Sequence, residues 1–353
     1  MTHSRRTFVQ RAGIAMATAA LGLTAAGISL SRERRSPAEA QDRLRVTTTV
    51  GMIADLVRNT GGDRVEVTAL MGPGIDPHLY KPSARDIGTL SEADIIFYGG
   101  LHLEGRMVET FEGIARSGKP TFAVSASIPE DRLLAFGSAH DPHIWFDVSL
   151  WILALEEVTA RLGDTFPDDA AQFRTNAAAY RTQLETLDAY VRTQAERVPE
   201  AQRVLVTAHD AFSYFGRAYG FEVQGLQGIS TASEAGAGDV RALIDLIVER
   251  RIGAIFVESS VSPATIEAVQ EGARARGWDV AIGGQLFSDA MGEDGTVEGT
   301  YIGMVTHNID TIVGALLGAL PDALPGDDGS DASPIATPAT APATTGTLME
   351  PTT

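Results

Sequence analysis

Two tripeptides in the first half of the chain are identical, and each ends in a histidine: Asp76-Pro77-His78 and Asp141-Pro142-His143. Proline fixes its own φ angle and favours extended backbone in the residue before it, so each tripeptide predicts a stiff loop. A stiff loop loses little entropy when its side chain binds a ligand. Neutral imidazole is the commonest metal ligand in proteins, although a single histidine in a loop is more often a surface residue.

The second half of the chain has two further loops of this kind. His209 follows the apolar run 204–208, and Asp289 lies in the segment 285–292 after another short apolar run. In open α/β sheets, ligands bind beyond the carboxyl ends of the strands. A lone aspartate near glycine is more often a turn former, so the prediction depends on the four loops together. Two loops from each half predict an ion held at the seam between them.

The set of donor atoms is limited because the chain contains no cysteine. This excludes disulfides, thiolate metal sites and cysteine nucleophiles. Imidazole and carboxylate remain, and they suit a borderline or hard divalent ion better than copper(I) or an iron–sulfur cluster. Of the other histidines, His102 and His307 are expected in capping or packing roles, His140 is a candidate for the entry to the site, and His3 lies in the first forty residues.

The four loops are carried by predicted strands and helices. Short β-branched or apolar runs alternate with amphipathic stretches along the chain. Strands are predicted at 44–50, 65–70, 94–98 and 121–124, then at 203–207, 221–226, 254–257 and 280–282. Helices are predicted at 83–92, with Ser83 as N-cap, and at 211–219, 239–250 and 263–276. This alternation is typical of two similar α/β lobes, each a sheet covered by helices.

One long helix is predicted between the two lobes. Residues 168–198 lack proline and glycine, and their apolar side chains recur at spacings of three and four: Phe173, Ala177, Tyr180, Leu184, Leu187 and Val191. At 1.5 Å per residue such a helix is roughly 45 Å long and could act as a stiff strut. An ordinary surface helix would show the same pattern.

The N-terminal forty residues are typical of a Tat export signal. Arg5 and Arg6 form a twin-arginine pattern, the apolar segment 13–30 follows, and Ala38-Glu39-Ala40 is a cleavage site. A membrane anchor is the alternative, but the segment is short and weakly apolar. The mature protein is therefore expected outside the cytoplasm. The tail from 321 is rich in Pro, Ala and Thr and is expected to be disordered.

The charge of the chain is strongly acidic, with 46 acidic against 28 basic residues and a net charge of −18. Cleavage after Ala40 would remove six arginines and two glutamates and leave −22. This argues against binding to nucleic acid through its phosphates. The negative charge is compatible with a cationic partner. It could equally serve only to keep the protein soluble.

At these residues the chain resembles the ABC-transporter solute-binding proteins for manganese and zinc, the TroA-like or ZnuA-like family (cluster A-I metal receptors). The resemblance covers 44–320 and is carried by five stretches: Asp76-Pro77-His78, Pro142-His143-Ile144-Trp145, Val206-Thr207-Ala208-His209-Asp210, Phe287-Ser288-Asp289-Ala290-Met291-Gly292 and Gly299-Thr300-Tyr301-Ile302-Gly303-Met304-Val305-Thr306-His307-Asn308.

The resemblance implies two α/β lobes joined by a single long helix, with the metal site at the lobe interface. The implied ligands are His78, His143, His209 and Asp289, and the implied partner is the membrane permease of a metal importer. Manganese-binding members usually carry Glu at the position of His209, whereas zinc-binding members carry His. Zinc is therefore favoured and manganese stays open, since the long His-rich loop of many zinc importers is missing.

The predicted organisation is a signal peptide at 1–40, a first lobe at 41–167, a linking helix at 168–200, a second lobe at 201–320 and a tail at 321–353. We expect a monomer that moves its lobes only modestly, because one continuous helix resists wide opening. Acid should release the ion as the histidines protonate, near a pKa of about 6.5.

Two other functions are weighed against a receptor. A zinc hydrolase needs an open coordination position and a general base, but neither His-Glu-x-x-His nor Gly-x-Ser-x-Gly occurs in the sequence. An enzyme is therefore not expected. A metal-binding surface adhesin is the second alternative, suggested by the Thr/Pro/Ala-rich tail, and it is compatible with metal binding.

Overall fold

The computed structural model describes residues 43–318. The predicted export signal and the predicted tail from 321 lie outside these residues. Among the described helices, none is both long enough and apolar enough to cross a membrane.

The first lobe is built on a parallel sheet with the strand order β2-β1-β3-β4. Its strands are β1 (Leu44–Thr48), β2 (Val65–Ala69), β3 (Ile95–Tyr98) and β4 (Thr121–Ala123). Val46 is paired with Val67 on one side and with Ile95 on the other, so β-branched side chains stack across the centre of the sheet. All four strands predicted for this lobe are confirmed.

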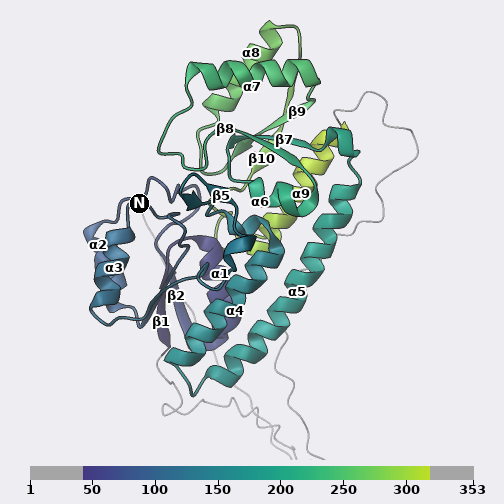
Figure 1. Cartoon of the computed structure of the whole chain (residues 1–353). Helices are drawn as coiled ribbons and strands as arrows, with labels where there is room; N and C mark the ends of the chain where they lie inside the picture. The colour runs from purple at the N-terminus through teal and green to yellow at the C-terminus, as the bar shows by residue number, and fades with distance from the viewer. Residues whose placement is uncertain (1–42, 319–353) are drawn as a thin grey trace, which may run out of the picture. The chain divides into compact units, whose positions relative to one another are not determined.

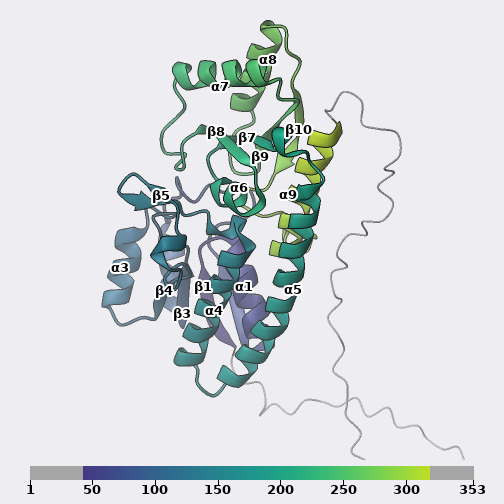
Figure 2. The ribbon, with the colours of Figure 1, turned by 45° about the vertical axis from the view of Figure 1, so that its right-hand side comes forward.

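Helices cover both faces of this sheet (Figures 1 and 2). On one face lie α2 (Ala84–Glu92) and α3 (Val108–Arg116), and on the other lie α1 (Gly51–Gly61) and α4 (Val148–Thr165). Ser83 is the N-cap of α2, as predicted: its Oγ accepts from Asp86 N, and the Asp86 carboxylate accepts from Ser83 N.

The second lobe repeats the pattern. Parallel pairing joins β7 (Val204–His209) to β8 (Glu222–Gln227) and β9 (Ala254–Glu258) to β10 (Ala281–Leu286), and β7 lies beside β9. Here α7 (Ala237–Arg250) and α8 (Ala264–Ala275) bury Leu243, Ile247 and Val269 against one face of these strands. The helix α6 (Ser213–Tyr219) follows β7. The predicted strands and helices of this lobe are also confirmed.

The predicted long helix is α5 (Ala170–Glu196), and all six apolar residues named from the sequence are buried. It packs against α1, α4 and the last described helix, α9 (Tyr301–Gly318). Arg64 forms a two-point ion pair with Asp169 just before α5, with both N···O distances below 3.0 Å. That α5 is the single connection between the lobes stays a prediction.

The loop that carries His143 follows two short strands that were not predicted from the sequence. The segment before His143 is not a strand of the parallel sheet but a short antiparallel hairpin, β5 (Ala135–Phe136) and β6 (Ala139–His140). Four 3₁₀ turns complete the described part: η1 (Gly62–Arg64), η2 (Glu130–Arg132), η3 (Ile144–Phe146) and η4 (Glu200–Gln202).

In each lobe the strand order reverses at one point, between β1 and β3 and between β7 and β9. In open α/β sheets, ligands bind beyond the carboxyl ends of the strands at such a point. In the first lobe the buried carboxylate of Glu104 fills this position, accepting from Thr49 Oγ1 and Gly99 N. In the second lobe His209 and Glu258 end the two strands. The carboxyl end of β7 therefore presents the imidazole of His209 toward the other lobe.

Candidate metal centre

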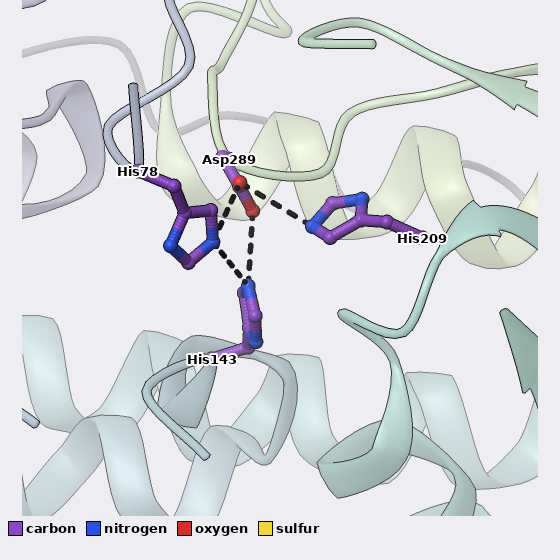
Figure 3. Close-up of side chains that lie close together, drawn as sticks. All are labelled: His78, His143, His209 and Asp289. Carbon is purple, nitrogen blue, oxygen red and sulfur yellow. Dashed lines mark hydrogen bonds and ion pairs between the residues drawn. The ribbon is translucent and has the colours of Figure 1, made fainter. Parts of the chain in front are cut away.

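Four side chains from distant parts of the chain point toward one another where the lobes meet: His78, His143, His209 and Asp289 (Figure 3). One ligand atom from each lies within 4.8 Å of all the others. The structure thus brings together every residue that the sequence named as a metal ligand.

The Asp289 carboxylate lies among the three imidazoles. Its Oδ2 is 3.4 Å from Nε2 of His78 and 3.4 Å from Nε2 of His209, and its Oδ1 is 3.4 Å from Nε2 of His143. The two first-lobe histidines approach each other to 3.2 Å between their Nε2 atoms. All three rings therefore turn the same nitrogen toward one point.

These groups are almost completely removed from solvent. The exposed fraction is 0% for His143 and His209, 1% for Asp289 and 5% for His78. Within residues 43–318, both carboxylate oxygens of Asp289 and Nε2 of His209 have no hydrogen-bond partner. Burying such atoms unpaired is costly, and a cation among them would satisfy all of them at once. The donor set therefore fits a metal ion.

The two Asp-Pro-His loops share one local structure. Asp76 Oδ1 accepts from His78 N at 2.8 Å, and Asp141 Oδ1 accepts from His143 N at 2.9 Å. This is the turn in which an aspartate binds the backbone two residues later, and the proline between them has no N–H to compete. The repeated tripeptide therefore fixes each histidine by the same means.

Carboxylates behind two of the histidines set their tautomers. His143 donates from Nδ1 to Asp141 Oδ1 at 2.7 Å, and His209 donates from Nδ1 to Glu258 Oε2 at 2.5 Å. Glu258 Oε1 also accepts from His209 N at 2.8 Å. Because Nδ1 carries the proton, Nε2 can offer its lone pair to a metal.

Two hydrogen bonds next to the cluster run between the lobes. Thr231 Oγ1 donates to Asp76 Oδ2 at 2.5 Å, behind His78. Trp145 Nε1 donates to Ser288 O at 3.1 Å, beside Asp289. These bonds join the two lobes close to the cluster, through residues one or two positions from His78, His143 and Asp289.

Burial and mutual charge shift the pKa values in the cluster in opposite directions. Burial opposes the ionisation of Asp289, but the surrounding His209, His143 and His78 outweigh it and hold the pKa of Asp289 well below its usual range. Burial lowers the pKa of His78 to about 4. Burial also lowers the pKa of His209, but Glu258 and Asp289 overcome this and raise it well above its ordinary value.

Three residues support the cluster without having been predicted to do so from the sequence: Glu258, Thr231 and Trp145. Glu258 ends the buried run 254–257, and a charged residue at the carboxyl end of a buried strand was a usable signal. Its partner His209 is 49 residues away, so the pairing itself was not readable. Asp76 and Asp141 stood in the repeated tripeptide, but their role as backbone acceptors was not predicted.

Known proteins similar to this chain are metal-binding proteins. A family model described as ZnuA, zinc-uptake complex component A, periplasmic, matches residues 46–315. The manganese-binding lipoprotein MntA of Bacillus subtilis (strain 168) is 51% identical over 278 residues, which cover 78% of this chain and 90% of that protein. The zinc-binding protein TroA of Treponema pallidum (strain Nichols) is 52% identical over 279 residues, covering 79% and 90%.

A solved structure agrees with the fold. The periplasmic zinc-binding protein TroA from Treponema pallidum matches with a TM-score of 0.76 and 52% identity, over 78% of this chain and 99% of that one. The family model spans more than two thirds of the chain, and both relatives share about half of the aligned residues. This chain therefore belongs to the ZnuA/TroA-like family of metal-binding, substrate-binding proteins of ABC transporters.

Proposed function

We propose that this protein captures one divalent metal ion outside the cytoplasm, with His78, His143, His209 and Asp289 as its ligands, and delivers the ion to the permease of an ABC importer. The convergence of the four ligand atoms supports this proposal. Donor atoms arranged tetrahedrally at the usual zinc distances lie roughly 3.4 Å apart. The separations of 3.2 and 3.4 Å in the cluster match that spacing.

Zinc is the ion that the donor set favours, and manganese is the second candidate. Three imidazoles and one carboxylate form a typical zinc site, whereas manganese prefers oxygen donors. The two named relatives are almost equally identical to this chain, yet one is called manganese-binding and the other zinc-binding. Overall identity therefore does not decide the ion, and His209 is the residue that favours zinc.

The ligand assignment is tested by calorimetry with Zn²⁺ and Mn²⁺ on the metal-free protein. His209→Ala removes one of four ligands and should weaken zinc binding by at least about a hundredfold. His102→Asn is the matched control, because His102 is exposed and outside the cluster and asparagine tolerates its φ of 64°. Zinc affinity that is equal in the wild type and His209→Ala would refute the assignment.

A transport role is favoured over a catalytic one. Four protein ligands complete a tetrahedral zinc shell and leave no position for a reactive water, which a zinc hydrolase requires. The protein should act as a monomer on its permease. Deleting its gene should slow growth in chelator-treated medium, and added zinc or manganese should restore growth. Unimpaired growth of the deletion strain at limiting metal would contradict a transport role.

We further propose the following organisation: a Tat signal at 1–40, lobes at 41–167 and 201–320 joined by a helix at 168–200, and a tail at 321–353. The relatives are named lipoproteins in several cases, but this sequence has no cysteine to acylate. Native mass spectrometry of protein from its own cell envelope would report both the bound element and the N-terminus. A chain that still begins at Met1 would contradict cleavage after Ala40.

A further inference from the structure

The buried cluster raises a question of access. A cation cannot reach ligand atoms whose residues are at most 5% exposed unless part of the protein opens. A pocket of about 230 Å³ lies against the cluster, and Asp289 is one of its lining residues, whereas the three histidines are not. That volume has room for several water molecules, as a hydrated cation needs.

The walls of this pocket come from both lobes. The first lobe contributes residues from both ends of α1, the edge strand β2 and the turn after it, and the second lobe contributes the loop that follows β10. Among the lining residues are Gly51, Arg58, Gly72, Asp289, Met291 and Asp294. A pocket walled by both lobes widens or narrows with any movement between them.

The charges of the pocket suit a cation. Asp289 is one of the lining residues and is 1% exposed; its carboxylate turns toward the three histidines, and neither oxygen has a hydrogen-bond partner within residues 43–318. Asp294 lies in the wall and is exposed to solvent. Arg58 is the one basic residue in the lining, so the lining contains two acidic residues and one basic residue. A divalent cation would be drawn from Asp294 toward Asp289.

Part of the pocket wall is a compact loop, since Gly292 and Asp294 are among the lining residues. Gly292 N donates to Glu298 O, and Thr296 N donates to Glu293 O, so residues 292–298 form a loop closed by its own backbone. The neck of this loop packs closely on the first lobe, since a Cβ added to Gly51 would lie 3.0 Å from the Met291 methyl group. Gly51 and Met291 both line the pocket, so this contact joins its two walls.

We infer that this pocket is the access path of the cation, with Asp294 as an outer, transient site for the hydrated ion and the 292–298 loop as the element that opens. The inference rests on the proposed function, because it takes the four-residue cluster as the destination of the ion. It adds a route and an outer residue to that function.

A path, unlike a ligand, leaves equilibrium affinity unchanged. Obstructing the path raises the barrier equally in both directions, so the association and dissociation rates fall together and their ratio stays the same. Gly72→Phe is the obstructing variant: Gly72 is exposed, and a Cβ there meets nothing within 4 Å, so a large side chain is tolerated at the pocket wall. Both rates should fall about tenfold, with Kd within twofold of wild type.

The rates are measured by stopped-flow fluorescence with Zn²⁺ for association and excess EDTA for dissociation. Trp145 is a built-in reporter, because its ring lies 5.2 Å from that of His143 and its Nε1 binds Ser288 O. Gly228→Phe is the matched control: it is also an exposed glycine with nothing within 4 Å, but it lines a different pocket, beside Asp210.

The outcomes separate the inference from the proposed function. If wild-type protein does not bind zinc, the proposed function fails. If it binds zinc but Gly72→Phe exchanges the ion at the wild-type rate, or Gly228→Phe is the slower variant, the access path is wrong. Asp294→Asn should slow association several-fold at low salt, and the effect should shrink at high salt. Slower association that does not depend on salt would overturn the role of Asp294.

Discussion

The buried carboxylate of Asp55 makes the stability of this protein depend on pH in an unusual direction. Asp55 lies in α1, is 6% exposed and accepts a hydrogen bond from the hydroxyl of Tyr180 in α5. Burial raises the pKa of Asp55 to about 6 from an ordinary 3.8, although the hydrogen bond from Tyr180 opposes the rise. The neutral acid is therefore favoured where α1 meets the long helix.

The magnitude follows from proton linkage. A rise of about two pKa units corresponds to about 3 kcal/mol between the two protonation states. Because the folded protein holds this proton more tightly than the unfolded chain, its stabilising effect is complete below pH 3.8 and is lost as the pH rises through 6. From pH 4 to pH 8 this one group should lower the free energy of unfolding by about 2.5 kcal/mol.

Asp55→Asn isolates this effect, because asparagine keeps an acceptor for Tyr180 and cannot ionise. Urea denaturation of the metal-free wild type and variant at several pH values gives the difference in unfolding free energy. Between pH 4 and pH 8, the unfolding free energy of the variant should rise by about 2.5 kcal/mol relative to that of the wild type. Asp131→Asn, at an exposed position, should show no such trend. A difference for Asp55→Asn that is flat with pH would refute the reasoning.

Two other predictions concern the bonds behind the ligands. In Glu258→Gln, one of the two His209 N–H groups faces an amide NH₂ in place of a carboxylate oxygen. The zinc affinity measured by chelator competition should therefore fall about 10- to 100-fold. Glu267→Gln, at an exposed position of α8, should leave the zinc affinity unchanged, and equal affinity of both variants would contradict the role of Glu258. Thr231→Val removes the donor to Asp76 Oδ2 between the lobes and should lower the unfolding free energy of the metal-free protein by about 1–3 kcal/mol, and Thr231→Ser should restore it. A valine variant as stable as wild type would show that this bond contributes nothing.

Local pattern was sufficient where a short stretch of sequence carries its own physical signal. The six apolar residues of α5 recur at helical spacing, and all of them are buried. Ser83 and Asp86 form the expected helix cap. The parallel strands also match, because a run of β-branched residues is apolar on both faces only when the strand is covered on both sides.

The hairpin before His143 shows where this reasoning failed. Its two strands have two residues each and lie at least partly exposed to solvent, so they produce no apolar run. The Asp-Pro-His loop at 141–143 was placed correctly as a stiff loop, but its support comes from Tyr214 in the second half of the chain, which donates to Asp141 O. A contact across 73 residues leaves no trace in local pattern.

The sequence by itself determined the chemistry of this protein: the absence of cysteine left imidazole and carboxylate, and the repeated tripeptide and two strand-end loops named His78, His143, His209 and Asp289. Their convergence within 4.8 Å was decided by the tertiary structure, because it depends on how the two lobes meet. The tertiary structure also decided the hydrogen-bond partners Glu258 and Thr231 and the pocket beside Asp289. Residue type and spacing are properties of a short segment, whereas burial and pairing belong to surfaces that exist only after folding.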